Sequence, residues 1–346
     1  MGGRTTKRAA IAAMAISLSG CIPAGYAPYD YRPAPKRSDA QTVSRLPSTP
    51  PAWELRPVSA DAKLVSASTY TVRHGDTLRG IANKTGAGSE AIARANHLSA
   101  PFTIYTGQKL TIPGGRYHRV KQGETGIAIA RAYGVPWSQV IAANDLESPY
   151  ILRVGQRILI PSTGPMTVAE RAAAFNLDIE DIVTGGEPAI GRGDRPAKAT
   201  ASSARVLPPT VAVQPPARLS GPFAWPVEGA VLKGFGPGKS GERNDGITIA
   251  VPLDTPVRAA ADGVVVYVGD DVPALGGIVI LKHGDDYATV YGHASQLLVQ
   301  RGQSVKRGQE IALSGDTGFA DRPELHFEIR KGRKPIDPMT KLPHRS

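Results

Sequence analysis

The sequence repeats itself at a constant offset of 48 residues, and this repeat constrains the fold more than any other feature of the chain. Residues 72–77 (VRHGDT) match residues 120–125 (VKQGET), and residues 107–113 (GQKLTIP) match residues 155–161 (GQRILIP). Between them, Ala95-Asn96 matches Ala143-Asn144. Matches at one spacing over this length predict two copies of one small structural unit, at residues 69–114 and 116–162.

Each copy is expected to fold as strand, helix, helix and strand. Thr77 and Thr125 stand where a helix begins, and their side-chain oxygens can accept a hydrogen bond from an unpaired backbone amide. Asn96 and Asn144 stand where a helix ends and are expected to be left-handed caps. The helices are expected at Leu78–Lys84 and Ser89–Ala95 in the first copy and at Gly126–Tyr133 and Trp137–Ala143 in the second.

The motifs Gly-Asp-Thr-Leu at residues 75–78 and Gly-Gln-Lys-Leu-Thr-Ile-Pro at residues 107–113 resemble the LysM family, whose members bind glycans that contain N-acetylglucosamine. The resemblance implies a shallow sugar groove between the loop after the first strand and the loop before the last. Backbone amides suit N-acetyl groups, apolar side chains suit sugar faces, and two weak sites would add avidity. A core role for Phe102 and Tyr150 stays open. The expected glycan-binding residues are Gly75, Asp76, Thr77, Leu78, Phe102, Thr103 and Ile104 in the first copy and Gly123, Glu124, Thr125, Tyr150 and Ile151 in the second.

The first 20 residues have the order of a bacterial secretion signal. Arg4, Lys7 and Arg8 precede an apolar run at residues 9–18 that is too short to span a bilayer. Residues 18–21 (LSGC) resemble a lipobox, which implies that Cys21 carries a lipid anchor that holds the chain in a membrane. An ordinary signal peptide with a coincidental cysteine is the alternative. Because Cys21 is the only cysteine, no disulfide can form within the chain.

Two Pro- and Ala-rich segments separate the parts that are expected to fold. Residues 21–68 are expected to be a disordered tether and residues 187–220 a disordered linker, because neither shows a periodicity that would bury one face. Residues 165–186 run parallel to the two-helix part of the repeat without its closing strand. We expect a helical remnant or a degenerate third repeat there.

The formal net charge of +11 favours a polyanionic partner. Because the N-terminal signal directs the chain out of the cytoplasm, the available polyanions are peptidoglycan carboxylates and anionic lipid head groups. Nucleic acid is therefore not an expected partner.

Residues 221–342 have the pattern of a β-rich domain. Runs of β-branched and aromatic residues bounded by Gly, Asp and Pro predict strands at residues 263–268, 277–283, 288–291 and 325–329. Together with Tyr291-Gly292-His293 and Glu324-Leu325-His326, this region resembles the LytM or lysostaphin-type metallopeptidase domain. The expected fold class is multidomain α+β, with two βααβ modules followed by an antiparallel β-rich domain, joined by disordered linkers.

In active members of that peptidase family, zinc is held by the His and Asp of an H-x-x-x-D motif and by the second His of an H-x-H motif. The resemblance places Asn244 and Thr248 at the first two ligand positions and His326 at the third, with His293 and Glu324 at the catalytic positions. Catalytic zinc needs about three protein ligands, and an amide and a hydroxyl are poor ones. We therefore expect no bound metal, no cofactor and no catalysis by this domain.

A shifted zinc site stays open as an alternative, with Glu324 and His326 joined by Asp245 or Glu242. The remaining histidines show no metal-like spacing. His283 is expected at a strand end on the surface, and His74, His97, His118 and His344 are expected to face solvent.

A lipidated chain with LysM repeats and a degenerate LytM domain resembles the NlpD-type activators, which bind peptidoglycan amidases. The resemblance implies a protein that binds peptidoglycan and activates a periplasmic N-acetylmuramoyl-L-alanine amidase in cell division and daughter-cell separation. It also implies a lipoprotein of the outer membrane that faces the periplasm, with the septum as the family's expected location. Two alternatives stay open: an active zinc-dependent peptidoglycan endopeptidase, and a structural lipoprotein that tethers the outer membrane to the wall.

Overall fold

The computed structural model describes residues 44–45, 50–55, 57–162, 177–202, 205, 207–238 and 243–345. The predicted signal peptide, Cys21, most of the tether and residues 163–176 of the predicted remnant lie outside these ranges, so those predictions stay predictions. Of the helices within these ranges, none is long and apolar enough to cross a membrane.

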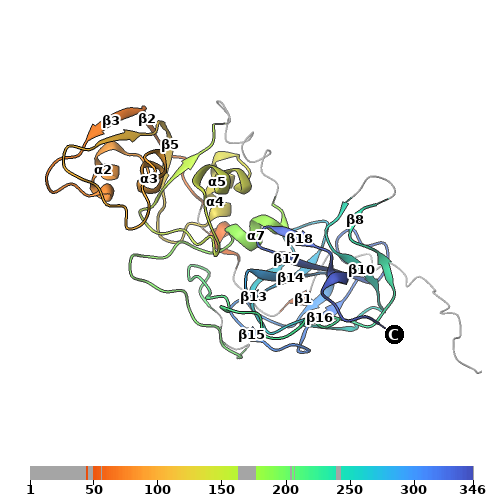
Figure 1. The fold of residues 1–346 in the computed structure, drawn as a ribbon. Helices are drawn as coiled ribbons and strands as arrows, with labels where there is room; N and C mark the ends of the chain where they lie inside the picture. The colour runs from red at the N-terminus through yellow and green to blue at the C-terminus, as the bar shows by residue number, and fades with distance from the viewer. Residues whose placement is uncertain are drawn as a thin grey trace, which may run out of the picture. The chain divides into compact units, whose positions relative to one another are not determined.

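The first repeat has the predicted order of elements (Figure 1). Its elements are β3 (Ser68–Thr71), α2 (Leu78–Thr85), α3 (Ser89–Ala95) and β4 (Lys109–Ile112). The two strands pair antiparallel, and Ile81, Ile92 and Leu110 form a core in which none of them is exposed. The side chain of Thr77 accepts a hydrogen bond from the backbone N–H of Gly80 at 3.0 Å, as expected of a helix cap.

The second repeat has the same order of elements. They are β5 (Gly115–Arg119), α4 (Gly126–Tyr133), α5 (Trp137–Asn144) and β6 (Arg157–Ile160). Trp137 and Tyr133 are buried at the centre of its core. Thr125 caps α4 by accepting a hydrogen bond from the backbone N–H of Ala128 at 3.0 Å. The equivalence of the two copies therefore extends from the sequence to the helix caps.

The two repeated asparagines do not act as left-handed caps, which corrects the prediction. Asn96 has a φ of −115°, and the left-handed residue at this helix end is the next one, His97, with a φ of 53°. The Asn96 side chain instead donates to the carbonyl oxygens of Ile92 and Thr111 and accepts from the Thr111 N–H. It thereby ties the end of α3 to β4. Asn144 makes the equivalent three hydrogen bonds, to Val140 and Leu159.

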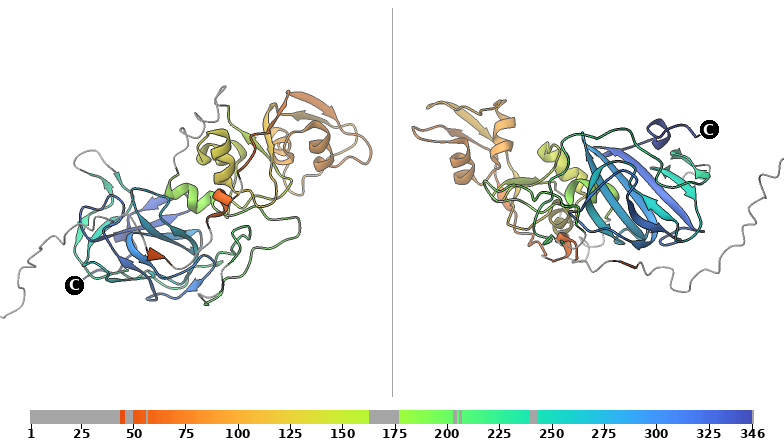
Figure 2. Two further views of the ribbon diagram at one scale, coloured as in Figure 1. Left: turned by 180° about the vertical axis from the view of Figure 1, so that it is seen from behind. Right: turned by 90° about the horizontal axis from the view of Figure 1, so that it is seen from below.

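The third part, called the β domain below, contains residues 221–342. Its elements are β7 (Val231–Lys233), β8 (Gly236–Pro237), β9 (Arg243–Asn244), β10 (Ile247–Ala250), β11 (Pro256–Arg258), β12 (Gly263–Gly269), β13 (Gly277–Gly284), β14 (Tyr287–Leu297), β15 (Ser304–Val305), β16 (Glu310–Ser314), β17 (Glu324–Lys331), β18 (Lys334–Ile336) and the 3₁₀ helix η1 (Pro338–Thr340). The main sheet has the order β15-β12-β13-β14-β17-β10-β7, and its long strands lie side by side in Figure 2. β1 (Ser44–Arg45) pairs with β14.

The predicted fold class is confirmed: two βααβ modules precede a domain of antiparallel strands. All strands along the main path of the large sheet pair antiparallel, including β13 with β14 and β14 with β17. Apolar side chains from these strands, among them Val279, Tyr291 and Phe327, meet in one core where none of them is exposed. This core holds the strands that carry the candidate peptidase-like site.

The C-terminal end of the predicted tether is ordered, which corrects the expectation for its described residues. It contains α1 (Ala52–Leu55) and β2 (Lys63–Val65). β2 pairs with β5 and adds a strand to the sheet of the second repeat. Trp53 is 6% exposed and stacks on Tyr267 of β12 with the ring centroids 5.6 Å apart. Strand pairing and the burial of one large aromatic side chain thus hold a segment that has no periodic pattern.

Several described residues of the second linker, residues 187–220, contact the β domain, which corrects the expectation of disorder for them. Glu187 forms an ion pair with Arg301 at 2.6 Å. The backbone N–H of Thr200 donates to the carbonyl oxygen of Gly302, and the N–H of Ser304 donates to the carbonyl oxygen of Thr200. Leu207 packs against the domain with 6% of its surface exposed. Hydrogen bonds to the edge of a sheet need no side-chain period, so composition alone did not predict this order.

Candidate functional site

The first repeat has an open cleft at the predicted glycan groove. The cleft has a volume of about 680 Å³, and five of the seven predicted residues line it. Gly75 and Thr103 are exposed but do not line it. Phe102 is 47% exposed, so it is not a core residue. The five predicted residues that line the cleft are Asp76, Thr77, Leu78, Phe102 and Ile104.

Asp76 braces the loop of this cleft. Its carboxylate accepts hydrogen bonds from the Tyr70 hydroxyl and the Arg73 N–H, both at 2.9 Å, and pairs with Lys84 at 2.6 Å. The hydrogen bond from Lys84 is the main reason that the pKa of Asp76 is lowered to about 2. Most of its hydrogen-bonding capacity is therefore used within the loop, which leaves backbone groups and apolar side chains to contact a sugar.

In the second repeat the predicted groove residues are mostly buried. Gly123, Glu124 and Thr125 are buried, whereas Tyr150 and Ile151 are partly exposed. The Glu124 carboxylate accepts from the Lys121 N–H at 2.8 Å and bonds Nε2 of His118 at 2.9 Å, so it braces its loop as Asp76 does. The five residues do not line a common cavity. Tyr150 packs against the core of the second repeat, as its alternative reading allowed.

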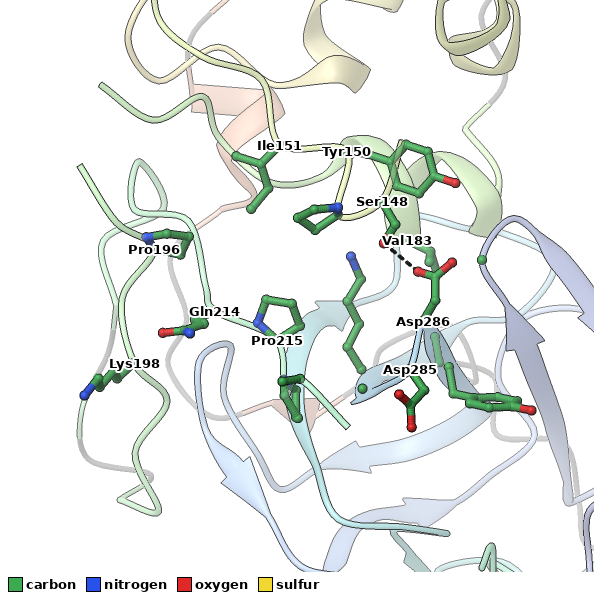
Figure 3. Close-up of a pocket in the computed structure, with 18 of the residues that line it drawn as sticks. Ser148, Tyr150, Ile151, Val183, Pro196, Lys198, Gln214, Pro215, Asp285 and Asp286 are labelled. Carbon is green, nitrogen blue, oxygen red and sulfur yellow. Dashed lines mark hydrogen bonds between the residues drawn. The ribbon is translucent and has the colours of Figure 1, made fainter. Parts of the chain in front are cut away.

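A second cavity of about 680 Å³ was not predicted from the sequence (Figure 3). The loop at residues 148–151, parts of the linker at residues 195–198 and 214–217, and the turn between β13 and β14 line it. The Ser148 hydroxyl donates to a carboxylate oxygen of Asp286 at 2.7 Å, as the dashed line in Figure 3 shows. Lys282 also lines the cavity, and burial lowers the pKa of its ammonium group. A lysine directly after the apolar run at residues 278–281 was the available sequence signal.

Adjacent strands of the β domain bring the candidate peptidase-like residues together. Thr248 on β10 is the register partner of His326 on β17, and Gly292 on β14 is the register partner of His326 on the other side. The rings of His293 and His326 lie 6.1 Å apart between centroids. Nε2 of His293 lies 3.9 Å from a carboxylate oxygen of Glu324. The structure therefore brings Thr248, His293, Glu324 and His326 close together on neighbouring strands and the loop beside them.

Asn244 lies at the edge of this group, on the short β9. Its side-chain amide donates to the carbonyl oxygen of Gly234 at 3.0 Å, and its side-chain oxygen accepts from the Gly246 N–H at 3.3 Å. Both ends of the amide are thus engaged in the β8–β9 hairpin, where Asn244 is the register partner of Gly236.

Burial controls the charges of the site. Desolvation lowers the pKa of His293 to about 4, with a smaller contribution from the charge of His326, while Nδ1 of His293 bonds the Thr317 carbonyl at 2.8 Å. Desolvation also raises the pKa of Glu324. Burial alone would raise the pKa of Glu328, but its hydrogen bonds with His326 and Arg330 lower it on balance. A neutral imidazole therefore faces Glu324 at neutral pH.

The donor set is the test of whether this site fits a metal. His326 directs Nε2 at a carboxylate oxygen of Glu328, 3.0 Å away, and the other carboxylate oxygen of Glu328 binds Arg330 at 2.7 Å. Thr248 supplies a hydroxyl and Asn244 an engaged amide. Within the part of the chain that the structure describes, no three His, Cys, Asp or Glu side chains are grouped so that they could hold a metal ion. These residues do not fit a zinc ion with three protein ligands.

Two histidines expected at the surface are buried, which corrects their prediction. His118 is 0% exposed between Tyr133 and Glu124. His283 is also 0% exposed and bonds the Asp262 carbonyl and the Thr289 hydroxyl. Both imidazoles have hydrogen-bond partners on both ring nitrogens, so they stabilise the fold.

Known protein families match both parts of the chain. The LysM domain family matches residues 70–113 and 118–161, and the family described as Peptidase family M23 matches residues 242–338. The chain is 37% identical to the lipoprotein NlpD/LppB homolog of Pseudomonas aeruginosa, over 84% of this chain and 82% of that protein. It is 32% identical to the murein hydrolase activator NlpD of Salmonella dublin, over 80% of this chain and 69% of that protein.

The chain is also similar in sequence, over a shorter stretch, to a longer protein. It is 40% identical to the cell division protein DipM of Caulobacter vibrioides over 41% of this chain. The match covers 25% of that protein, so the chain spans about a quarter of the length of this relative.

Proposed function

The chain belongs to the NlpD-type family of lipoproteins with LysM repeats and an M23 domain, and from this premise we propose that it binds peptidoglycan and activates a cell-wall amidase. The amidase would be a periplasmic N-acetylmuramoyl-L-alanine amidase. In this proposal the M23 domain binds the amidase and does not itself hydrolyse peptidoglycan.

One observation carries the proposal: the chain matches Peptidase family M23, yet the residues at its candidate zinc positions form a donor set that is unsuited to zinc. Thr248 stands beside His326, and Nε2 of His326 faces Glu328. Zinc-dependent hydrolysis needs a metal that lowers the pKa of a bound water. Without that metal the strands around His293 and His326 are free to serve as a binding surface.

Exposed apolar side chains near this site support a protein partner. Val231 and Leu232 on β7, the strand next to Thr248, are 39% and 42% exposed. Phe319 is 76% exposed and lies two residues after Thr317, whose carbonyl oxygen is hydrogen-bonded to Nδ1 of His293. Exposed apolar residues grouped around a polar site are typical of a protein interface. Activation would be a population shift, in which the chain binds the open form of the amidase more tightly than the closed form.

The proposed location follows from the family and from residues outside the described ranges. A lipid on Cys21 would anchor the chain in the outer membrane, facing the periplasm. The LysM repeats would then hold it at the peptidoglycan, with the septum and daughter-cell separation as the proposed place and process.

Dye release from labelled peptidoglycan tests the proposal. The full chain alone, each periplasmic amidase of its host alone and the two together are compared, and the zinc content of the chain is measured beside them. We expect release only from one combined sample, and no bound zinc. Release by the chain alone, abolished by a chelator and by His326→Ala, would establish a peptidase instead. No added release with any amidase would favour a structural tether.

A matched pair of variants locates the surface. Phe319→Ser removes an exposed apolar side chain beside the site and is expected to lower activation by about tenfold, the effect of losing one interface anchor. Met339→Ser changes a side chain that is 46% exposed on η1 and is expected to leave activation unchanged. Equal effects of the two substitutions would place the amidase elsewhere.

A further inference from the structure

The two repeats carry equivalent grooves in sequence but not in the structure. In the first repeat Thr77 is exposed and Asp76 is partly exposed. Their equivalents in the second repeat, Thr125 and Glu124, are 0% and 6% exposed. Something therefore covers the second groove and leaves the first one open.

Residues 188–190 of the same chain cover the second groove. On one side, the backbone N–H of Ala189 donates to the carbonyl oxygen of Glu124 at 2.8 Å. On the other side, the N–H of Ile190 donates to the carbonyl oxygen of Leu152 at 3.0 Å, and the N–H of Val154 donates to the carbonyl oxygen of Ile190 at 2.9 Å. The segment thus joins the loop after the first strand to the loop before the last strand. This is the place that the LysM resemblance assigns to a sugar.

Contacts on both sides hold this segment in place. Before it, α7 (Ile179–Gly185) packs against α4 and α5. A Cβ added at Gly185 would lie 2.7 Å from the indole ring of Trp137, so this end of α7 fits closely against the core of the second repeat. Within the segment, Ala189 is 4% exposed. Directly before it, Glu187 forms an ion pair with Arg301. A covalently attached segment competes at high effective concentration, so a weakly binding sugar would not displace it.

The second repeat instead completes the open cleft of the first. Besides Thr77 and Phe102, the cleft is lined by Arg153 and Arg157 of the second repeat. Arg157 donates a hydrogen bond to the side-chain oxygen of Asn83 at 2.8 Å, which holds its guanidinium at the edge of the cleft. Arg153 is exposed. The cleft is therefore a joint feature of both repeats.

The charges of this cleft favour a ligand with carboxylates. Its charged residues are Arg79, Arg153, Arg157, Asp76 and Glu90, and the charge of Asp76 is balanced by Lys84 at 2.6 Å. Positive charge therefore exceeds negative charge. A guanidinium group binds a carboxylate through two parallel hydrogen bonds. Peptidoglycan strands carry such carboxylates on their stem peptides, whereas plain N-acetylglucosamine oligomers carry none.

We propose that the chain has one glycan site, formed by the groove of the first repeat and the arginines of the second, and that residues 188–190 occupy the second groove in place of a glycan. The ligand is an N-acetylglucosamine-containing strand with carboxylate-bearing stem peptides. This inference rests on the proposed function, because it takes glycan binding by the LysM repeats as its premise.

Calorimetric titration of the full chain in detergent counts the sites. The ligands are a soluble peptidoglycan tetrasaccharide with stem peptides and an uncharged N-acetylglucosamine tetramer. We expect one tetrasaccharide per chain, bound more tightly than the uncharged tetramer. Two per chain would overturn this inference and leave the proposed peptidoglycan binding intact, whereas no binding would overturn the proposed function itself.

Matched substitutions at equivalent positions of the repeats assign the site. Phe102→Ala is expected to weaken binding about tenfold, which is about 1.4 kcal/mol, and Tyr150→Ala less than about twofold. Arg153→Ala is expected to weaken binding of the peptide-bearing ligand about fivefold, and that of the uncharged tetramer less than about twofold. Lys109→Ala, at the first-repeat equivalent of Arg157, is the control and should change neither. Equal losses from Phe102→Ala and Tyr150→Ala would overturn the assignment.

Ala189→Pro tests the covering segment directly. Proline has no N–H to donate to Glu124, so the substitution removes one of the hydrogen bonds that hold the segment. We expect the folded variant, checked by its melting temperature, to bind two ligands per chain. A variant that is folded and still binds one ligand would show that the second groove is not a masked sugar site.

Discussion

At the scale of single residues, the repeat preserves bracing contacts more strictly than it preserves exposed groove residues. Asp76 and Glu124 brace equivalent loops, and Asn96 and Asn144 make the same three hydrogen bonds. The sequence predicted the equivalence of these pairs from their offset. It did not predict which member of a pair is exposed, because exposure depends on residues 188–190, which lie outside the repeat.

Asn144→Ala is expected to destabilise the second repeat. The Asn144 side chain is 7% exposed, and its loss leaves the carbonyl oxygens of Val140 and Leu159 and the N–H of Leu159 without this partner. A loss of about 2–3 kcal/mol in the free energy of unfolding follows from leaving buried polar groups unpaired. Urea denaturation measures it. Gln139→Ala, exposed on the same helix, is the control, and equal midpoints for the two variants would contradict the bracing role.

Lys282→Met is expected to raise the melting temperature by a few degrees at pH 7. Desolvation lowers the pKa of Lys282, so its charged form is disfavoured in the folded chain relative to the unfolded chain. A methionine of similar length keeps the contacts of the stem without that cost. Calorimetry at pH 7 measures the shift, and Lys334→Met, at an exposed position, serves as the control. A lower melting temperature than that of the unchanged chain would show that the ammonium group stabilises the cavity.

The errors made at single residues have one physical cause. His283 was assigned to the surface because it stands at a predicted strand end, and His118 because it shows no metal-like spacing. Their partners come from elsewhere in the chain: Tyr133 for His118, and the Asp262 carbonyl for His283. Whether a histidine is buried depends on hydrogen-bond partners that are distant in the sequence, and a local sequence pattern does not reveal them.

At the scale of elements, the pattern predicted helices and strands well where a period and a cap coincide. α2 and α4 begin where Thr77 and Thr125 indicated, and β13 and β17 begin within one residue of their predicted starts. Helical content was also expected over residues 165–186, and α7 lies in the described part of that range. The sequence pattern did not predict that α7 packs between the second repeat and the β domain. Glu180 on α7 pairs there with Arg333.

The burial of α7 predicts a pH dependence of stability. Desolvation, and then the nearby charge of Asp178, raises the pKa of Asp181 to about 7, whereas an unfolded aspartate has a pKa of about 3.9. As the pH rises from about 4 to about 7, the unfolded chain releases this proton before the folded chain does. Stability from this group therefore declines over that window, by at most about 4 kcal/mol, and stays constant above it.

Asp181→Asn removes this dependence. We expect the variant to be more stable than the unchanged chain at pH 8 and to match it near pH 4, as measured by melting temperature across the range. Glu147→Gln, at an exposed position, should leave the pH profile as it is. Parallel profiles for Asp181→Asn and the unchanged chain would contradict a buried, protonated Asp181.

At the scale of the whole molecule, composition predicted the parts but not the contacts between them. The proline- and alanine-rich composition of residues 187–220 was interpreted as that of a linker, and these residues do connect the repeats to the β domain. Glu187 contacts Arg301 and Thr200 contacts Ser304, so the segment is bound to the β domain at these points. A disordered linker and a segment bound along a sheet edge share one composition, because main-chain hydrogen bonds depend weakly on side chains.

Limited trypsin digestion distinguishes a disordered linker from a segment that is bound along the edge of a sheet. Arg192, Lys198 and Arg218 lie within the segment, and trypsin would cut a disordered linker after them at once. Because cleavage requires local opening of the bound segment, we expect the full chain to resist cutting there and the double substitution Glu187→Ala with Arg301→Ala to be cut at least about tenfold faster. The matched control, Arg258→Ala with Glu310→Ala, removes an exposed ion pair at 3.0 Å elsewhere on the β domain and should not change the rate. Rapid cutting of the unchanged chain would mean that the segment is free in solution, and the second groove would then lose the anchor that follows its covering residues.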